Sequence, residues 1–234
     1  MAVQQAQEPR MRNRPQVFRR LLLVPLVGIL LALAGLTMIN SRYDFFRQPA
    51  YTMAPALPMG RTVVVDTADR SRPNRGDIVL LDRGRWPGEP DGGKSLLRVA
   101  GLPGDKLSCC DDRAALEVNG TRIGPMAPAA TAPFESTVPA GRVFVTGDNS
   151  ELAKDSRFFV SEQSGTLPLD AVKGRAVGTI LPVGDAGALN GASMTYFYLM
   201  ALITGIGVLT FLVGAAAAWM RRPRQYVESQ PQVS

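Results

Sequence analysis

The chain has 234 residues, a formal net charge of +6 and 46% hydrophobic residues, and it contains no histidine. The missing imidazole excludes a Ser-His-Asp triad, a Cys-His pair and any histidine metal ligand. Two cysteines are too few for a thiolate zinc site or a disulfide-rich scaffold, so we expect neither a metal ion nor a cofactor. The positive charge would suit a nucleic-acid-binding protein, so its position along the chain matters.

Two uncharged apolar stretches, residues 21–40 and residues 193–220, are long enough to cross a bilayer as helices, which takes about 20 residues. A cleaved signal peptide is the alternative for the first stretch. Its apolar run exceeds the usual ~7–15 residues, and the small-residue sequence Ala32-Leu33-Ala34 lies inside the run, which favours an uncleaved anchor. A buried core helix is the alternative for the second stretch, whose glycines and alanines either permit close helix packing or only reflect composition.

Arginines flank both apolar stretches and account for the whole net charge, because the segment between the stretches is neutral. By the positive-inside rule, both termini are therefore cytoplasmic. The sequence predicts a cytoplasmic tail (residues 1–20), a transmembrane helix (21–40), an extracytoplasmic domain (41–192), a second transmembrane helix (193–220) and a cytoplasmic tail (221–234). The expected location is the cytoplasmic membrane. The lipid bilayer is an expected partner, and nucleic acid is not.

The segment between the two spans is expected to be mainly β, because short runs rich in Val, Ile and Leu alternate with Gly and Pro and no helical period persists. Asn119-Gly120 predicts a tight hairpin turn. Residues 83–94 and 124–139 are expected to be loops because of their Pro and Gly content. The predicted strands are Thr62–Asp66, Asp77–Asp82, Leu96–Gly101, Leu116–Asn119, Arg142–Thr146 and Arg175–Leu181.

Four sequence blocks follow the first apolar stretch in a fixed order. They are Pro49-Ala50-Tyr51-Thr52-Met53-Ala54-Pro55-Ala56-Leu57, Arg75-Gly76-Asp77-Ile78-Val79, Leu97-Arg98-Val99-Ala100-Gly101-Leu102-Pro103-Gly104-Asp105, and Gly147-Asp148-Asn149 through Asp155-Ser156-Arg157. The segment that holds them, roughly residues 49–182, resembles the bacterial type I signal peptidases, membrane-anchored endopeptidases that remove signal peptides from secreted precursors. The resemblance implies a signal-peptidase-like, coiled antiparallel β-sheet domain between the two transmembrane α-helices, and it implies signal peptides or secretory precursors as partners.

The resemblance also implies a serine–lysine mechanism. In that family a serine hydroxyl attacks the scissile carbonyl, and a lysine whose pKa is lowered by apolar surroundings takes its proton. A backbone N–H and a second serine stabilise the oxyanion.

This chain departs from the family pattern at every one of these polar positions. The nucleophile position holds Thr52 and the lysine position holds Leu97, while Ala50 replaces the oxyanion serine and Ala153 replaces the serine that orients the lysine. Asp155 and Arg157 persist and are expected to give structural support. Losing a general base costs on the order of 10²–10⁴ in rate, and losing an oxyanion donor costs about 10²–10³.

The leading hypothesis is therefore a catalytically impaired signal peptidase homologue that acts at the outer face of the membrane. It would bind or regulate secretory precursors, or regulate a separate, active signal peptidase. An alternative is an active peptidase that uses Thr52 as nucleophile with Lys94 or Lys154 as a non-standard base. A structural membrane protein without peptide binding is a third reading. The adjacent Cys109 and Cys110 are open to several interpretations: a redox-active pair, a disulfide with each other, pairing across molecules, or a plain packing or structural role.

Overall fold

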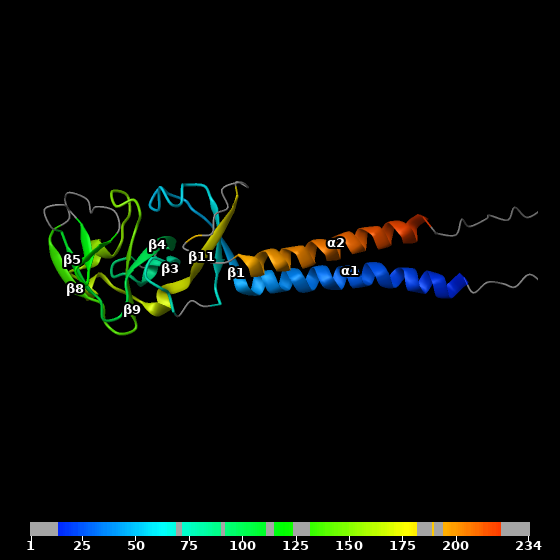
Figure 1. The fold of residues 1–234 in the computed structure, drawn as a ribbon, viewed down its shortest axis with the longest axis horizontal. Helices are drawn as coiled ribbons and strands as arrows, with labels where there is room; N and C mark the ends of the chain where they lie inside the picture. The colour runs from blue at the N-terminus through cyan, green and yellow to red at the C-terminus, as the bar shows by residue number, and fades with distance from the viewer. Residues whose placement is uncertain are drawn as a thin grey trace, which may run out of the picture. The chain divides into compact units, whose positions relative to one another are not determined.

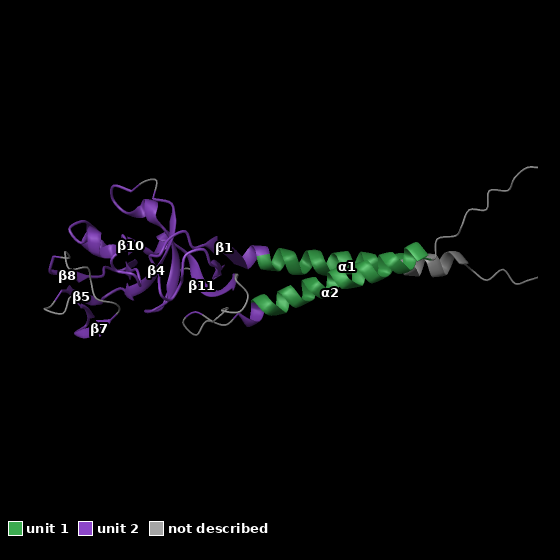
Figure 2. Cartoon of the chain, turned by 90° about the horizontal axis from the view of Figure 1, so that it is seen from above, with its two compact units in different colours: residues 1–39, 197–234 green, residues 40–196 purple. Residues whose placement is uncertain are grey.

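The computed structural model describes residues 14–68, 72–89, 92–110, 115–123, 132–181, 189 and 194–220. The chain divides into two compact units, which Figure 2 colours separately: residues 1–39 with 197–234, and residues 40–196. The predicted C-terminal tail (residues 221–234), and most of the N-terminal tail and of the connection before the second helix, lie outside the described residues.

The first unit is built on two long helices, α1 (Arg14–Arg42) and α2 (Thr195–Met220). Residues 22–42 and 195–220 are long and apolar enough to cross a membrane, with mean hydropathies of 2.6 and 2.2. Their large apolar side chains are mostly exposed, as at Leu30 (58%) and Leu209 (63%), which is what a lipid-facing helix requires. The two helices therefore make a pair whose outer surface is apolar.

Glycines set the contact between α1 and α2, which lie side by side in Figure 1. A Cβ atom placed on Gly28 would overlap the backbone of Phe211, and one on Gly207 would overlap the backbone of Ala32. By contrast, Gly205 has open space around it. The glycines at positions 28 and 207 thus allow the two backbones to approach closely, so at these positions the small residues have a packing role and do not merely reflect composition.

The second unit holds a seven-stranded sheet in the order β1-β2-β11-β3-β4-β9-β10, with every neighbouring pair antiparallel. Register shifts interrupt β11 opposite both of its neighbours and β4 opposite β9. Such bulges increase the local twist, so the sheet coils. The strands are β1 (Tyr43–Arg47), β2 (Thr62–Asp66), β3 (Ile78–Asp82), β4 (Lys94–Gly101), β9 (Arg142–Thr146), β10 (Leu167–Pro168) and β11 (Val172–Leu181).

A smaller antiparallel sheet has the order β7-β6-β5-β8. Its strands are β5 (Lys106–Cys109), β6 (Leu116–Val118), β7 (Thr121–Ile123) and β8 (Phe134–Thr137). Asn119 and Gly120 both take positive φ in the turn between β6 and β7, which confirms the predicted hairpin. Cys109, at the end of β5, is joined to Cys110 by a disulfide, so the two cysteines do not pair across molecules.

The buried apolar residues form two clusters. The larger includes Val63, Leu80, Leu97 and Val145 of the larger sheet, and the smaller joins Leu107 of the smaller sheet to Phe144 on β9 of the larger sheet. Four 3-10 helices complete the described structure: η1 (Arg83–Arg85), η2 (Ser156–Phe159), η3 (Gln163–Gly165) and η4 (Leu169–Ala171). The fold is thus a mainly β, coiled antiparallel sheet flanked in sequence by two apolar helices, as the sequence predicts.

The strand predictions are right for β2 and β9 to the residue, and within three residues for β3, β4, β6 and β11. The sequence misses β1, β5, β8 and β10. The loop predicted over residues 124–139 is wrong at Phe134–Thr137, because these residues pair with β5 in spite of the prolines around them. The loop predicted over residues 83–94 contains η1 and ends in the first residue of β4.

Replacing Gly207 by alanine should loosen the helix pair, while the same change at Gly205 should not. Alanine favours a helix over glycine by roughly 1 kcal/mol at both positions, so only the overlap with Ala32 distinguishes them. We expect a lower melting temperature for Gly207→Ala than for Gly205→Ala, measured by circular dichroism in detergent. Equal melting temperatures would contradict close packing at Gly207.

Candidate functional site

The candidate nucleophile, Thr52, lies in the turn segment after β1 and is half-buried. Its Oγ1 accepts a hydrogen bond from Gln48 Nε2 at 3.1 Å, and the same amide nitrogen donates to the Ala50 carbonyl at 2.8 Å. Gln48 is itself 1% exposed. Both N–H groups of this buried amide are therefore used to hold the segment that carries Ala50 and Thr52.

A second loop, after β9, closes against Thr52. Asn149 N donates to the Thr52 carbonyl at 3.0 Å, and Ala153 N donates to the Asn149 carbonyl at 3.0 Å. A Cβ atom on Gly147 would meet both the Ala153 side chain and the Thr52 carbonyl, so only glycine fits there. The structure thus brings together Ala50, Thr52 and Ala153, three of the positions singled out in the sequence.

Leu97, which the sequence resemblance aligns with the lysine of the family, lies on β4 opposite Val79 of β3. It is 1% exposed and belongs to the same apolar core as Met53 and Ala153, the neighbours of Thr52 in the chain and across Gly147. Its side chain is part of the core and carries no group that could accept a proton.

The two lysines considered as substitute bases are each paired with a carboxylate. Lys94 Nζ lies 3.4 Å from Asp44 Oδ2, and Lys154 Nζ is paired with Glu89 Oε1. Burial acts to raise the pKa of Glu89, but hydrogen bonds from Lys154 and Arg83 outweigh it and hold that pKa below its usual value. Both lysine side chains are half exposed and bound to carboxylates, so neither lies in the apolar surroundings that a lysine base requires.

Asp155 and Arg157 form a buried ion pair, with side chains 0% and 3% exposed. The carboxylate accepts from Arg157 Nη2 at 2.6 Å and Nε at 3.0 Å, and also from Gly147 N at 2.9 Å. Asp155 further caps η2 by accepting from the Arg157 backbone N–H. The pair therefore fixes the loop that carries Gly147 and Ala153.

The other acidic residues of the sequence blocks also hold loops in place. Asp148 accepts a two-pronged hydrogen bond from Arg98, at 2.7 and 2.5 Å, and Arg98 also donates to the Gly76 carbonyl at 2.8 Å. Asp77 accepts from the Asn74 backbone N–H at 2.7 Å. Each carboxylate accepts hydrogen bonds from nearby donors, so these two acidic residues of the sequence blocks stabilise the loops in which they lie.

Asp105 closes the turn between β4 and β5. It accepts from the Leu102 N–H at 2.7 Å, from Asn119 Nδ2 at 2.8 Å and from Arg75 Nη2 at 2.6 Å. Burial acts to raise the pKa of Asp105, but these three hydrogen bonds outweigh it, so the pKa lies below its usual value.

Sequence reasoning missed Gln48, the one side chain that bonds to the Thr52 hydroxyl among the described residues. Nothing in the local pattern identifies it, because a single glutamine after a strand is an ordinary surface residue. At this contact the Gln48 amide nitrogen donates its hydrogen to the Thr52 hydroxyl oxygen, so Gln48 cannot accept the hydroxyl proton. No cluster of three or more His, Cys, Asp or Glu side chains suited to a metal ion occurs in the described part of the chain.

Removing one member of the buried Asp155–Arg157 pair should destabilise the domain strongly. Asp155→Ala leaves the Arg157 charge buried without a partner, which typically costs about 3–5 kcal/mol of unfolding free energy. The exposed pair Arg85–Asp170 supplies the control, and Asp170→Ala should cost about 0–1 kcal/mol. Urea unfolding in mild detergent, followed through the fluorescence of Trp86 stacked on Phe159, measures both. Similar losses in the two variants would contradict the structural role of Asp155.

The contribution of Asp105 should depend on pH. Because its folded-state pKa is depressed, its stabilisation is present above the unfolded value of about 3.9 and is lost as the pH falls through the folded-state pKa. We expect Asp105→Asn to lower the melting temperature at pH 7 and the gap from wild type to shrink below pH ~4. Thermal unfolding between pH 7 and pH 2.5 checks this, and a gap independent of pH would contradict it.

Comparison with known proteins gives consistent matches. The family model described as signal peptidase, peptidase S26, matches residues 20–181. The mitochondrial ATP-independent inner membrane protease subunit 1b of Arabidopsis thaliana is 30% identical over 157 residues, which cover 65% of this chain and 79% of that protein. Signal peptidase I U of Bacillus subtilis is 29% identical over 130 residues, covering 49% of this chain and 65% of that protein.

Among solved structures, a signal peptidase I from Enterococcus faecalis V583 matches with a TM-score of 0.33 and 25% identity, covering 44% of this chain and 96% of that one. The mitochondrial inner membrane protease subunit 1 of Mus musculus is 31% identical over 118 residues, which are 50% of this chain and 55% of that protein. Because the family model covers well over half of the sequence, this chain belongs to the signal peptidase family, peptidase S26.

Proposed function

We propose that this protein binds signal-peptide-bearing precursors at the outer face of the cytoplasmic membrane and cleaves them weakly or not at all. The observation that carries the proposal is the pair of contacts at the dyad positions. The Thr52 hydroxyl meets an amide N–H from Gln48, and the lysine position is a core leucine, Leu97. A hydroxyl needs a proton acceptor to become a nucleophile, and neither residue is one.

The intact framework supports a retained binding role. Asp148, Asp155 and Gly147 hold the loops beside Thr52 in a defined geometry, although the groups that would do chemistry are gone. Residues held this firmly can still present a surface to a peptide. Signal-peptide-bearing precursors are the partner class that family membership suggests.

Exposed apolar side chains next to the site residues support an apolar peptide as the ligand. Tyr51 is 51% exposed beside Thr52, and Leu152 is 59% exposed beside Ala153. In addition, β1 is an edge strand of the larger sheet and leads directly into the Thr52 segment. An extended peptide can pair with the edge of a sheet, which is how strand addition works.

Restoring the family residues should restore cleavage. The quadruple variant Ala50→Ser, Thr52→Ser, Leu97→Lys and Ala153→Ser returns all four polar groups, and the buried setting of residue 97 lowers a lysine pKa toward a catalytic value. We expect precursor cleavage at the signal-peptide junction at least ~10²-fold above the matched triple variant that keeps Leu97. Cleavage of a purified secretory precursor in detergent, read by gel and mass, measures this.

Wild type and Thr52→Ala should be indistinguishable in the same assay. Wild-type cleavage that disappears in Thr52→Ala would overturn the proposal that catalysis is impaired and would support an active peptidase with Thr52 as nucleophile. In that case, the variants Lys94→Ala and Lys154→Ala would show which lysine is the base. Binding is tested separately with a precursor that carries a photocrosslinker in its signal peptide. Capture should fall in Tyr51→Ser with Leu152→Ser but not in Thr121→Ser on the smaller sheet, and no capture by wild type would overturn the binding role.

A further inference from the structure

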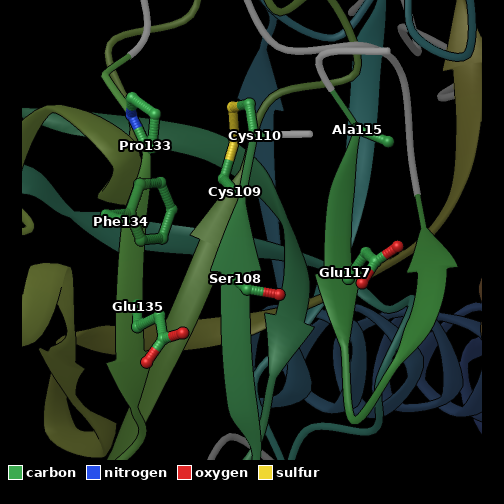
Figure 3. Close-up of a pocket in the computed structure, with 8 residues that line it drawn as sticks. All are labelled: Ser108, Cys109, Cys110, Ala115, Glu117, Pro133, Phe134 and Glu135. Carbon is green, nitrogen blue, oxygen red and sulfur yellow. A yellow bond between two sulfur atoms is a disulfide. The ribbon is translucent and has the colours of Figure 1, made fainter. Parts of the chain in front are cut away.

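The disulfide between Cys109 and Cys110 opens into a hollow of about 430 Å³ on the outer side of the smaller sheet (Figure 3). Ser108, Glu117 and Glu135 line the same hollow, because Ser108 of β5 is opposite Glu117 on β6 and Glu135 on β8. The two sulfur atoms therefore share one surface with two carboxylates. This surface belongs to the smaller sheet, whereas Thr52 lies in the turn segment after β1 of the larger sheet.

A disulfide stabilises a fold mainly by closing a loop in the unfolded chain, and the effect grows with the number of residues enclosed. Cys109 and Cys110 are neighbours in sequence, so their bond encloses no other residue. It therefore ties no distant parts of the chain together. A covalent link that contributes so little chain entropy, and that lines an open hollow, suggests a chemical role more than a structural one.

We propose that Cys109–Cys110 is a thiol–disulfide exchange site that favours aminothiols over anionic thiols. Cys109 is 6% exposed and packs in the smaller core, whereas Cys110 is only partly buried. The more accessible sulfur is thus that of Cys110, and the sulfur of Cys109 is the leaving group.

The exchange balances with two equivalents of thiol. A thiolate attacks Sγ of Cys110, the sulfur–sulfur bond breaks, and Cys109 leaves with the electron pair and takes a proton from water. A second thiolate then attacks the mixed disulfide, which releases the Cys110 thiol and a small-molecule disulfide. Two electrons and two protons pass from the two thiols to the protein.

Among the described residues that line the hollow, Glu135 is the main source of the charge preference. Glu117 is partly neutralised by Arg122, whose Nε lies 3.4 Å from Glu117 Oε1. The exposed Glu135 has no such ion pair among the described residues, although Lys106 lines an adjoining hollow that shares Ser108 and Glu135. One exposed carboxylate that lines the same hollow as the attacked sulfur should change relative rates by roughly threefold to tenfold at low salt.

The test compares cysteamine with 3-mercaptopropionate as reductants of the purified full-length protein in neutral detergent. For each reductant, the rate constant with the protein is calculated for its thiolate form. It is then divided by the rate constant of the same thiolate with a small neutral disulfide, and this ratio removes differences in intrinsic nucleophilicity. We expect the cysteamine preference to be roughly threefold to tenfold, and to shrink toward one as salt rises to ~0.5 M. Alkylation and intact mass count the released thiols.

Glu135→Gln should abolish most of this preference, whereas Glu162→Gln, an exposed acid in the loop before η3, should keep it. Treated with cystamine, the disulfide of cysteamine, Cys109→Ser should hold a single cysteamine adduct at Cys110 with release of one cysteamine, because no Cys109 thiol is present to displace the adduct, and it should keep the native circular dichroism. A preference that survives Glu135→Gln would overturn the acidic selection. Free thiols in the air-oxidised protein, or reduction only at the rate of global unfolding, would overturn the exchange site altogether.

Discussion

The buried carboxylate of Asp155 is the constraint on which the candidate site depends. It is 0% exposed and accepts four hydrogen bonds, from the Gly147 backbone, the Arg157 backbone and the Arg157 guanidinium. A buried charge is tolerated only when donors surround it, so the loop from Gly147 to Arg157 must keep one geometry for the domain to fold. That geometry in turn presses Gly147 against the Thr52 carbonyl and the Ala153 side chain.

This dependence explains how the loops around Thr52 can keep their geometry under the impaired function proposed above. The polar residues of a serine–lysine site contribute to rate and little to folding, so replacing them by threonine, leucine and alanine leaves the core well packed. Leu97 shows this most clearly, because an aliphatic side chain at a buried strand position stabilises the core in a way that a lysine cannot. Asp155, Asp148 and Asp105 are different, since each accepts hydrogen bonds from backbone N–H groups or arginines that hold its loop in place.

Much of the fold could be predicted from local pattern, and the failures have a common cause. Strands β2 and β9 are dense in valine and have turn residues at their ends, so they are visible in the sequence. Strands β1, β5, β8 and β10 are short or polar, and they are strands only because a distant partner supplies their hydrogen bonds. In the site, the resemblance to the family motif singled out Thr52, Leu97, Ala50 and Ala153 as candidates. The contact from Gln48 depends on how the chain turns after β1 and has no local signature.

The close approach of α1 and α2 at Gly28 and Gly207 has a mechanical consequence for the way the chain would sit in a bilayer. Helices separated by a layer of long side chains can slide or splay when the membrane thickness changes. Here backbone meets backbone, so little compressible material lies between the axes. A hydrophobic length that did not match the bilayer would then be met by tilting both helices together, as one body with a single tilt angle.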